Sequence, residues 1–113
     1  MDYYHIWCDL QSGKEDLAFS RAVQRYLGHL ADQRLISGYR LTRRKLGFGP
    51  EELGEFHLII ETQNLVQLES AFAQVAKRSG ETENLHRDVF EKVSRVRFGL
   101  YRDFPDPGRE QGE

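Results

Sequence analysis

Two histidines in separate apolar stretches are the side chains best suited to proton transfer near neutral pH. His5 lies in YYHIWCDL near the N-terminus, and His57 lies in EFHLIIET in the middle of the chain. Either imidazole could act as a general base. Completed by Asp9 or Glu61, the pair could instead hold a metal ion, but no short metal-binding motif supports this, so we assign no metal ligand. A third interpretation is that both histidines only form hydrogen bonds in a polar cavity or interface.

Alternation along residues 3–10 predicts a strand whose two faces differ in chemistry. One face carries an ordinary core set: Tyr4, Ile6, Cys8 and Leu10. The other mixes two bulky aromatic rings with an imidazole and a carboxylate: Tyr3, His5, Trp7 and Asp9. Trp7 could stack on a flat ligand or anchor an interface between subunits, because tryptophan is favoured in both roles. Cys8 we interpret as a small core residue without chemistry.

Charged and aromatic residues elsewhere could complete a binding site with this face. Asp9 we expect to pair with Arg97 or with an arginine of the second strand. If Tyr39 and Leu41 face the core, Arg44 faces the opposite side and could hold an anionic ligand. The alternative is an edge strand that positive charges protect from aggregation. Arg97 could stabilise developing negative charge, and Tyr101 could hold an aromatic substrate.

The elements that must position these residues follow in the order strand, helix, strand, strand, helix, strand. Period-2 alternation predicts strands over residues 3–10, 39–46, 55–62 and 95–104. Helical spacing of apolar residues predicts helices over 16–35 and 65–76, with Ser12 and Asn64 as candidate caps. Loose helical spacing of Leu85, Val89 and Val93 predicts a further short helix. Gly47, Gly49 and Pro50 mark a loop that runs to Gly54.

This order is that of the ferredoxin-like α+β fold, βαββαβ, in which two helices cover one face of a four-stranded antiparallel sheet. The first and third strands are neighbours in that topology, so His5, Trp7 and Asp9 would lie beside His57 and Ile59. Trp7, Tyr3, Ile59 and Tyr101 would then form a large apolar patch, and such patches mark interfaces or binding sites. We therefore expect a second copy to pack its sheet against this face and enclose a cavity between the sheets.

The stretches YYHIWCDL, RRKLGFGPEELGEFH and FGLYRDFPDP resemble a short bacterial family within the dimeric α+β barrel superfamily. The resemblance covers nearly the whole chain and implies a homodimer whose two sheets pair into a barrel. The superfamily includes stress-responsive proteins, cofactor-free monooxygenases, haem-degrading enzymes and dye-type peroxidases, so the fold does not settle an activity. In related barrels the region after the second helix approaches the cavity mouth, which makes His86 an additional candidate. We can assign no proximal histidine for haem, and we expect no cofactor.

Composition narrows the possible partners. Charged residues make up 30% of the chain and hydrophobic residues 39%, values typical of a folded protein. A net charge of −2 argues against nucleic acid or an anionic membrane as partner. RNA-recognition modules share the topology, but His57 and Ile59 stand where their stacking aromatic residues belong.

No secretory signal or spanning segment is visible, so we expect a cytoplasmic protein with one domain over residues 1–104 and a polar tail over 105–113.

Two classes of function remain open at this stage. The first is a homodimer that binds a small aromatic or anionic molecule between its sheets, as a carrier or as a cofactor-independent monooxygenase-like enzyme. In the enzyme, His5 or His57 would be the base. The second is a stress-response or structural dimer without turnover, whose interface is filled by its own side chains. The space left between the sheets distinguishes the two.

Overall fold

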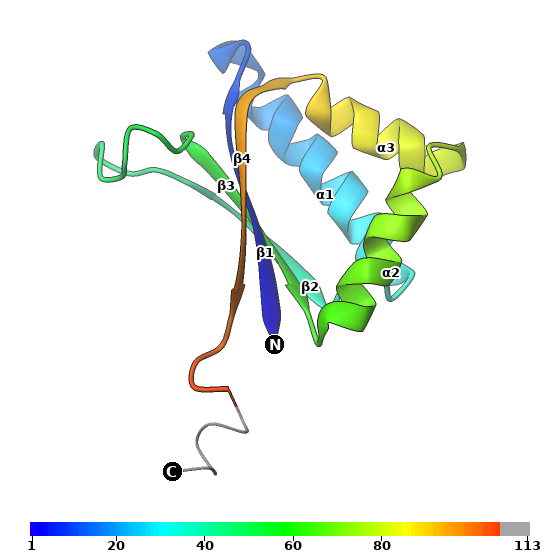
Figure 1. Ribbon diagram of the computed structural model, residues 1–113. Coiled ribbons are helices and arrows are strands. Elements are labelled where there is room, and N and C mark those ends of the chain that lie inside the picture. The colour runs from blue at the N-terminus through cyan, green and yellow to red at the C-terminus, as the bar shows by residue number, and fades with distance from the viewer. Residues whose placement is uncertain (107–113) are drawn as a thin grey trace.

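The computed structural model describes residues 1–106 and contains a four-stranded antiparallel sheet with all its helices on one face (Figure 1). The strands are β1 (Asp2–Leu10), β2 (Gly38–Arg43), β3 (Phe56–Thr62) and β4 (Val93–Arg102), in the order β2-β3-β1-β4. The α-helices are α1 (Asp16–Asp32), α2 (Leu65–Ala76) and α3 (Gly80–Phe90). The predicted ferredoxin-like fold is confirmed. The part of the predicted tail beyond residue 106 lies outside the described residues.

The core lies between the sheet and α1. Ile6 and Cys8 of β1 and Leu58 of β3 are buried on the helix side of the sheet, as their alternation predicts. They meet the apolar stripe of α1, in which Phe19, Val23 and Leu27 are wholly buried. Burial also raises the pKa of the Cys8 thiol to about 12, so this cysteine is an inert core residue.

The helix ends agree only in part with the sequence predictions. The Asn64 side chain accepts a hydrogen bond from the Gln67 amide, which confirms it as the cap of α2. The capping role predicted for Ser12 is wrong, since its side chain makes no capping bond and a short 3-10 turn (Gly13–Glu15) precedes α1.

Over residues 1–106, no helix is both long and apolar enough to cross a lipid bilayer.

The second half of β4 departs from the predicted core. Alternation along β4 predicts that Phe98 is buried against the helices with Val96, yet its exposed fraction is 59%, and Leu100 is similarly exposed. Phe72 of α2 is also about half exposed. The physical reason is that β4 is an edge strand and its helix-side residues lie at the margin of the helical layer. The helix side of the sheet is therefore incompletely covered near Phe98.

Candidate functional site

A cluster of four rings lies on the sheet face that the helices leave uncovered, which we call the open face. We call His5, Trp7, His57 and Tyr101 the open-face cluster. The imidazoles of His5 and His57 both stack on the indole of Trp7, with centroid distances of 5.3 and 4.6 Å. The Tyr101 ring meets His5 edge-on at 4.9 Å. The structure thus brings together four of the residues that sequence analysis selected for chemistry.

The two imidazoles are joined by a hydrogen bond between Nδ1 of His5 and Nε2 of His57, with a separation of 2.8 Å. Burial lowers the pKa of both histidines, and the proximity of His5 lowers that of His57 further. Both rings are therefore predominantly neutral near pH 7, and one nitrogen of the pair donates while the other accepts. A neutral pair of this kind can accept a proton, but each ring already has a partner.

Strand register explains why the cluster forms. Trp7 pairs with His57 on β3 and with Arg97 on β4, so the indole lies at the centre of the open face. Opposite His5 on β4 is Gly99, where an added Cβ would lie 3.2 Å from the indole ring of Trp7 and 3.1 Å from the ring of Tyr101. The missing side chain of Gly99 is what lets these rings meet over β4.

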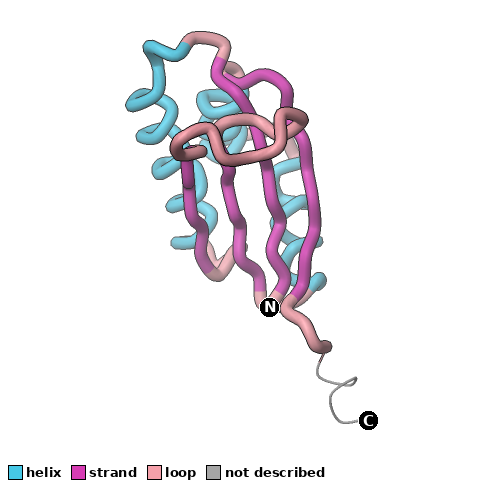
Figure 2. Tube along the Cα trace, turned by 90° about the vertical axis from the view of Figure 1, so that its left-hand side faces the viewer, coloured by secondary structure: helices cyan, strands magenta, loops and turns pink. Residues whose placement is uncertain are grey.

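The loop between β2 and β3 lies in front of the strands in Figure 2, and Figure 1 shows that it projects from the open face. We call this loop, residues 44–55, the strap. The guanidinium of Arg44 donates to the carbonyls of Pro50 and Leu53 at 2.8 and 2.7 Å, so it holds the strap in shape. The ligand-binding role predicted for Arg44 stays a prediction, but its guanidinium already has these partners. β2 ends at Arg43, three residues before the predicted end at 46.

The strap is also fixed to β1 and β4. Gly54 packs directly on the backbone of Cys8, where a Cβ would lie 2.3 Å from the Cys8 carbonyl carbon and oxygen. Asp9 accepts from the Glu55 amide at 2.8 Å and pairs with Arg95 at 3.0 Å. The predicted pairing of Asp9 with Arg97 or a β2 arginine is therefore wrong. Trp7 pairs with Arg97, and the register then shifts by one residue, so that Asp9 pairs with Ser94 while the neighbouring Arg95, at positive φ, still reaches the carboxylate.

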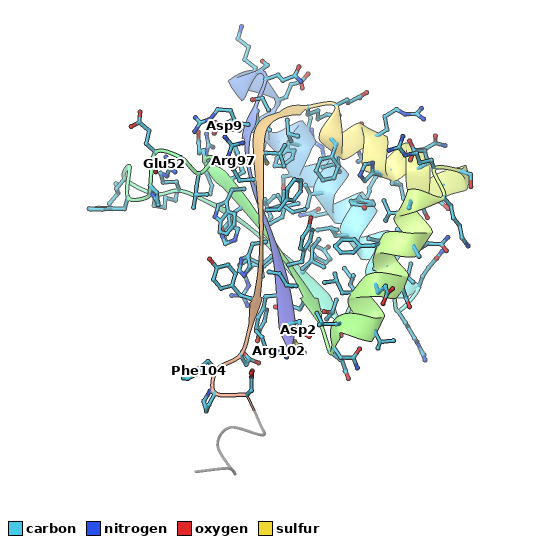
Figure 3. All side chains as sticks on the ribbon, viewed as in Figure 1. Asp2, Asp9, Glu52, Arg97, Arg102 and Phe104 are labelled. Atoms are coloured by element: carbon cyan, nitrogen blue, oxygen red, sulfur yellow. The ribbon has the colours of Figure 1, made fainter. Side chains whose placement is uncertain are left out.

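A small pocket remains between the strap and the sheet. Its volume is about 190 Å³, and Trp7, His57 and Arg44 contribute to its lining. Arg97 stands beside Trp7 on β4 and is exposed, and its guanidinium donates to the carbonyl of Val96. The structure therefore brings Trp7, His57 and Arg44 to one pocket, while Asp9 is engaged with the strap and with Arg95. In Figure 3, Asp9 and Arg97 both lie in the half of the sheet from which the strap projects.

A different cavity lies on the other side of the sheet, between the strands and the helices. We call it the helix-side cavity. Its volume is about 340 Å³, and its lining is almost entirely apolar. Phe72 of α2, Phe90 of α3 and Phe98 of β4 contribute rings to it. Because Phe72 and Phe98 are about half exposed, they mark the side at which the cavity meets solvent.

Three polar side chains line the helix-side cavity: Tyr4, Tyr26 and His86. The Tyr26 ring meets His86 edge-on at 5.5 Å, and His86 stacks on Phe90 at 4.6 Å. Burial lowers the pKa of His86, so the imidazole is predominantly neutral near pH 7. Burial raises the pKa values of Tyr4 and Tyr26, which keeps both phenols protonated. The cavity thus offers phenol donors and an imidazole acceptor inside apolar walls.

Sequence analysis selected His86, whereas it assigned Tyr4 to the core face of the first strand, and Tyr26 lies in the apolar stripe of α1. The sequence feature that could have indicated them is a tyrosine within each apolar stripe, because a buried phenol needs either a hydrogen-bond partner or a cavity. Within residues 1–106, no group of three or more His, Cys, Asp or Glu side chains is arranged so that it could hold a metal ion.

The strand order and the helical layer define this protein as a ferredoxin-like α+β protein, and solved structures show the same fold. A dimeric protein of unknown function from Bacteroides fragilis has a TM-score of 0.62 at 13% identity, covering 90% of this chain and 95% of that one. A protein from Arabidopsis thaliana has a TM-score of 0.70 at 8% identity, covering 94% and 98%. A putative antibiotic biosynthesis monooxygenase from Bordetella bronchiseptica has a TM-score of 0.61 at 14% identity, covering 90% and 96%.

The particular family is given by sequence. The chain belongs to the family described as "Family of unknown function (DUF6614)", whose model matches residues 1–113. This agrees with the predicted resemblance to an uncharacterised family of ferredoxin-like proteins. No curated protein matches the chain in sequence.

Proposed function

We propose that this protein is a homodimer that binds a small, largely apolar molecule in the helix-side cavity of each copy. The observation that carries the proposal is the cavity of about 340 Å³ between sheet and helices, with aromatic walls and few polar groups. Small-molecule sites are typically concave and mostly apolar, with a small number of polar groups that fix the ligand's orientation. Both the volume and the lining match that description.

The polar groups suggest what the ligand presents. The neutral imidazole of His86 can accept a hydrogen bond, and the phenols of Tyr4 and Tyr26 can donate one. A ligand with a hydroxyl or carbonyl group on a flat apolar body would satisfy these groups and stack against Phe72 or Phe98. Bound next to His86, an acidic proton of such a ligand would lie within reach of a neutral base. This is the enzymatic version of the proposal, with His86 in the role that sequence analysis gave to His5 or His57.

The open face is the proposed dimer interface. The open-face cluster is partly exposed and combines Trp7 with Tyr101 and two neutral histidines, a composition favoured at the centres of interfaces. Its rings already stack on one another, which supports the interpretation that this face is largely filled by its own side chains. The dimeric state described for the Bacteroides fragilis protein supports two copies here as well.

A second candidate places the ligand between the two sheets. The pocket of about 190 Å³ under the strap favours it, since Trp7 and His57 both line this space. An aromatic or anionic molecule bound there would use His5 or His57 as base and Arg97 or Tyr101 as contacts. The monooxygenase names of some structural neighbours support an oxygenase-like reaction in either pocket. The cytoplasmic location and the absence of nucleic-acid partners stay predictions from sequence.

Two phenylalanine substitutions on α2 test the proposal. Ala71 is buried and lines the helix-side cavity, whereas Ala73 on the same helix is exposed. Ala71→Phe should fill the cavity and lower the affinity for the fluorescent probe 8-anilinonaphthalene-1-sulfonate by at least about tenfold, because the apolar space is lost. Ala73→Phe should leave the affinity within about twofold of the unmodified protein. Titrations of probe fluorescence would measure both.

Equal binding by Ala71→Phe and the unmodified protein would contradict the helix-side site. If Trp7→Ala abolished probe binding while Ala71→Phe did not, the ligand would lie between the sheets. Thermal melting should accompany the titrations, and Val75→Leu offers a milder filling of the same cavity if Ala71→Phe does not fold. Native mass spectrometry of the freshly purified protein should show a dimer, and a reproducible added mass would identify the retained ligand.

A further inference from the structure

The outer turn of the strap presents two large apolar side chains to solvent. Leu46 has an exposed fraction of 89% and Phe48 one of 82%. We call residues 45–50 the strap tip. Single exposed apolar residues are common on monomers, but two such residues beside each other on one turn form an apolar surface that a partner can cover.

The backbone of the strap tip holds these side chains in place. Leu46 and Gly47 both have positive φ, 56° and 73°, and the Phe48 amide donates to the Lys45 carbonyl at 3.0 Å. A left-handed backbone is unfavourable for leucine, so the surrounding turn must impose it. Gly49 is also constrained, since a Cβ there would lie 2.5 Å from Nε of Arg44. The tip is therefore a shaped projection, and a preformed surface loses little conformational entropy when it binds.

The anchors of the strap determine where the tip lies. Arg44 closes the strap on itself, and Arg95 of β4 donates to the Glu51 carbonyl at 2.7 Å. In Figure 1 the strap projects from the open face, on the side away from the helices. Figure 3 shows Glu52 on this projection, well separated from the helical layer. The tip thus extends to the same side as the open-face cluster, where a second copy would lie.

Charge favours a protein partner over a membrane. The strap carries Glu51, Glu52 and Glu55 against Arg44 and Lys45, so it has no excess of positive charge. Loops that insert apolar residues into anionic membranes gain from flanking basic residues, and this strap lacks such an excess. A dimer interface, by contrast, uses mixed charges around an apolar centre.

We propose that the strap tip of each copy packs on the other copy, so that Leu46 and Phe48 become buried in the dimer. The inference rests on the proposed open-face dimer and extends it, because the two straps would grip the partner beyond the sheet-to-sheet contact. Two-fold symmetry makes the contact occur twice. Each copy would then contribute one strap tip and receive one.

The test compares two double variants in sedimentation velocity over a dilution series. Leu46→Ser with Phe48→Ser should raise the dimer dissociation constant by at least about tenfold, since burial of these side chains is lost twice. The matched control is Leu65→Ser with Val66→Ser on α2, where Val66 is 73% exposed and lies in the helical layer. The control should dimerise like the unmodified protein. The strap-tip side chains are exposed in the single chain, so thermal melting should show both variants folded.

A photo-crosslinker gives an independent measurement. Phe48→p-benzoylphenylalanine, irradiated in the purified protein, should give a covalent species of twice the chain mass. The inference is overturned if no such species forms, or if the strap-tip variant dimerises as tightly as the control while the unmodified protein is a dimer. It is also overturned if the variant only loses binding to phosphatidylcholine–phosphatidylserine vesicles, which would make the tip a membrane contact. A monomeric unmodified protein would refute the proposed dimer itself.

Discussion

The two faces of the one sheet carry aromatic and polar side chains in different states of packing. On the open face, His5, Trp7 and His57 stack on one another, and the two histidines share a hydrogen bond, so these rings occupy much of the space between them. On the helix side, Tyr26 and His86 border an apolar cavity of about 340 Å³. The face richer in candidate chemistry is thus the one with less empty space.

The difference teaches that reactive residue types and available volume are separate requirements for a binding site. Side chains that already satisfy one another gain little from a ligand, since a ligand must first replace those contacts. Apolar walls around unfilled space gain from any molecule that excludes water. We therefore assign the open face to contact between copies and the helix side to a ligand. Substitutions on each face and a change of pH test this assignment.

The largest effect is expected from Gly54→Ala, which acts only on the open face. Its new Cβ would lie 2.3 Å from the backbone of Cys8, so the strap must leave its place on β1. We expect a loss of about 3 kcal/mol or more in the free energy of unfolding, measured with urea. The control is Gly13→Ala, where a Cβ would meet nothing within 4 Å. Equal stability of the two variants would show that the strap is not packed on β1.

A smaller effect, on assembly and not on folding, is expected from Trp7→Ala. Removal of a central interface tryptophan should weaken the dimer by about 2 kcal/mol or more, which exceeds a tenfold change in dissociation constant. Probe binding in the helix-side cavity should remain. Phe72→Ala on α2 should weaken probe binding and leave dimerisation unchanged, because its ring lines that cavity and not the open face. Sedimentation velocity and probe titration would measure the two effects, and a Trp7 variant with unchanged assembly would refute the open-face interface.

The smallest effect is a pH dependence of stability that both faces share. Burial lowers the pKa of His5, His57 and His86 in the folded protein below the usual 6.5. Below pH 6.5 the unfolded chain therefore binds protons that the folded chain does not, and stability falls as the pH falls. Above pH 6.5 this contribution is fully present. Because the histidines are partly exposed, solvent screening limits the change to about 1 kcal/mol in total.

Substitution separates the two faces in this measurement. As the pH falls from 6.5 to 5, His5 and His57 take up protons in the proposed interface, so the dimer should dissociate more readily. His5→Gln with His57→Gln should remove this pH dependence of dissociation. His86→Gln should reduce only the pH dependence of unfolding. If His86→Gln altered the pH dependence of dissociation as well, the helix-side cavity and the interface would not be independent.

Much of the arrangement of the open face could be predicted from sequence. Strict alternation in β1 and β3 decides which side chains share a face, and the order of elements decides that β1 and β3 are neighbours. Together they bring Trp7 to His57. Arg95 also lies opposite Asp9 if the pairing of Trp7 with Arg97 continues regularly, so the register and not the residue types identifies this partner; the one-residue shift that pairs Asp9 with Ser94 could not be predicted.

The helix-side cavity could not be predicted in the same way. Tyr4 and Tyr26 belong to apolar stripes, and a stripe does not say whether its residues are in contact or border an empty space. The exposure of Phe98 depends on how far α2 and α3 extend over the edge of the sheet. That extent is set by helix packing and by the lengths of loops, not by the residues of β4.

By itself the sequence determined the secondary structure, the ferredoxin-like topology and the two faces of each strand, because these depend on local periodicity and on the order of elements. Only the tertiary structure decided where volume is left over: a cavity beside His86, a filled cluster around Trp7, and a strap fixed over the open face. The physical reason is that a cavity is a property of many side chains packing at once. Its volume depends on distances between segments far apart in the chain, which no local pattern records.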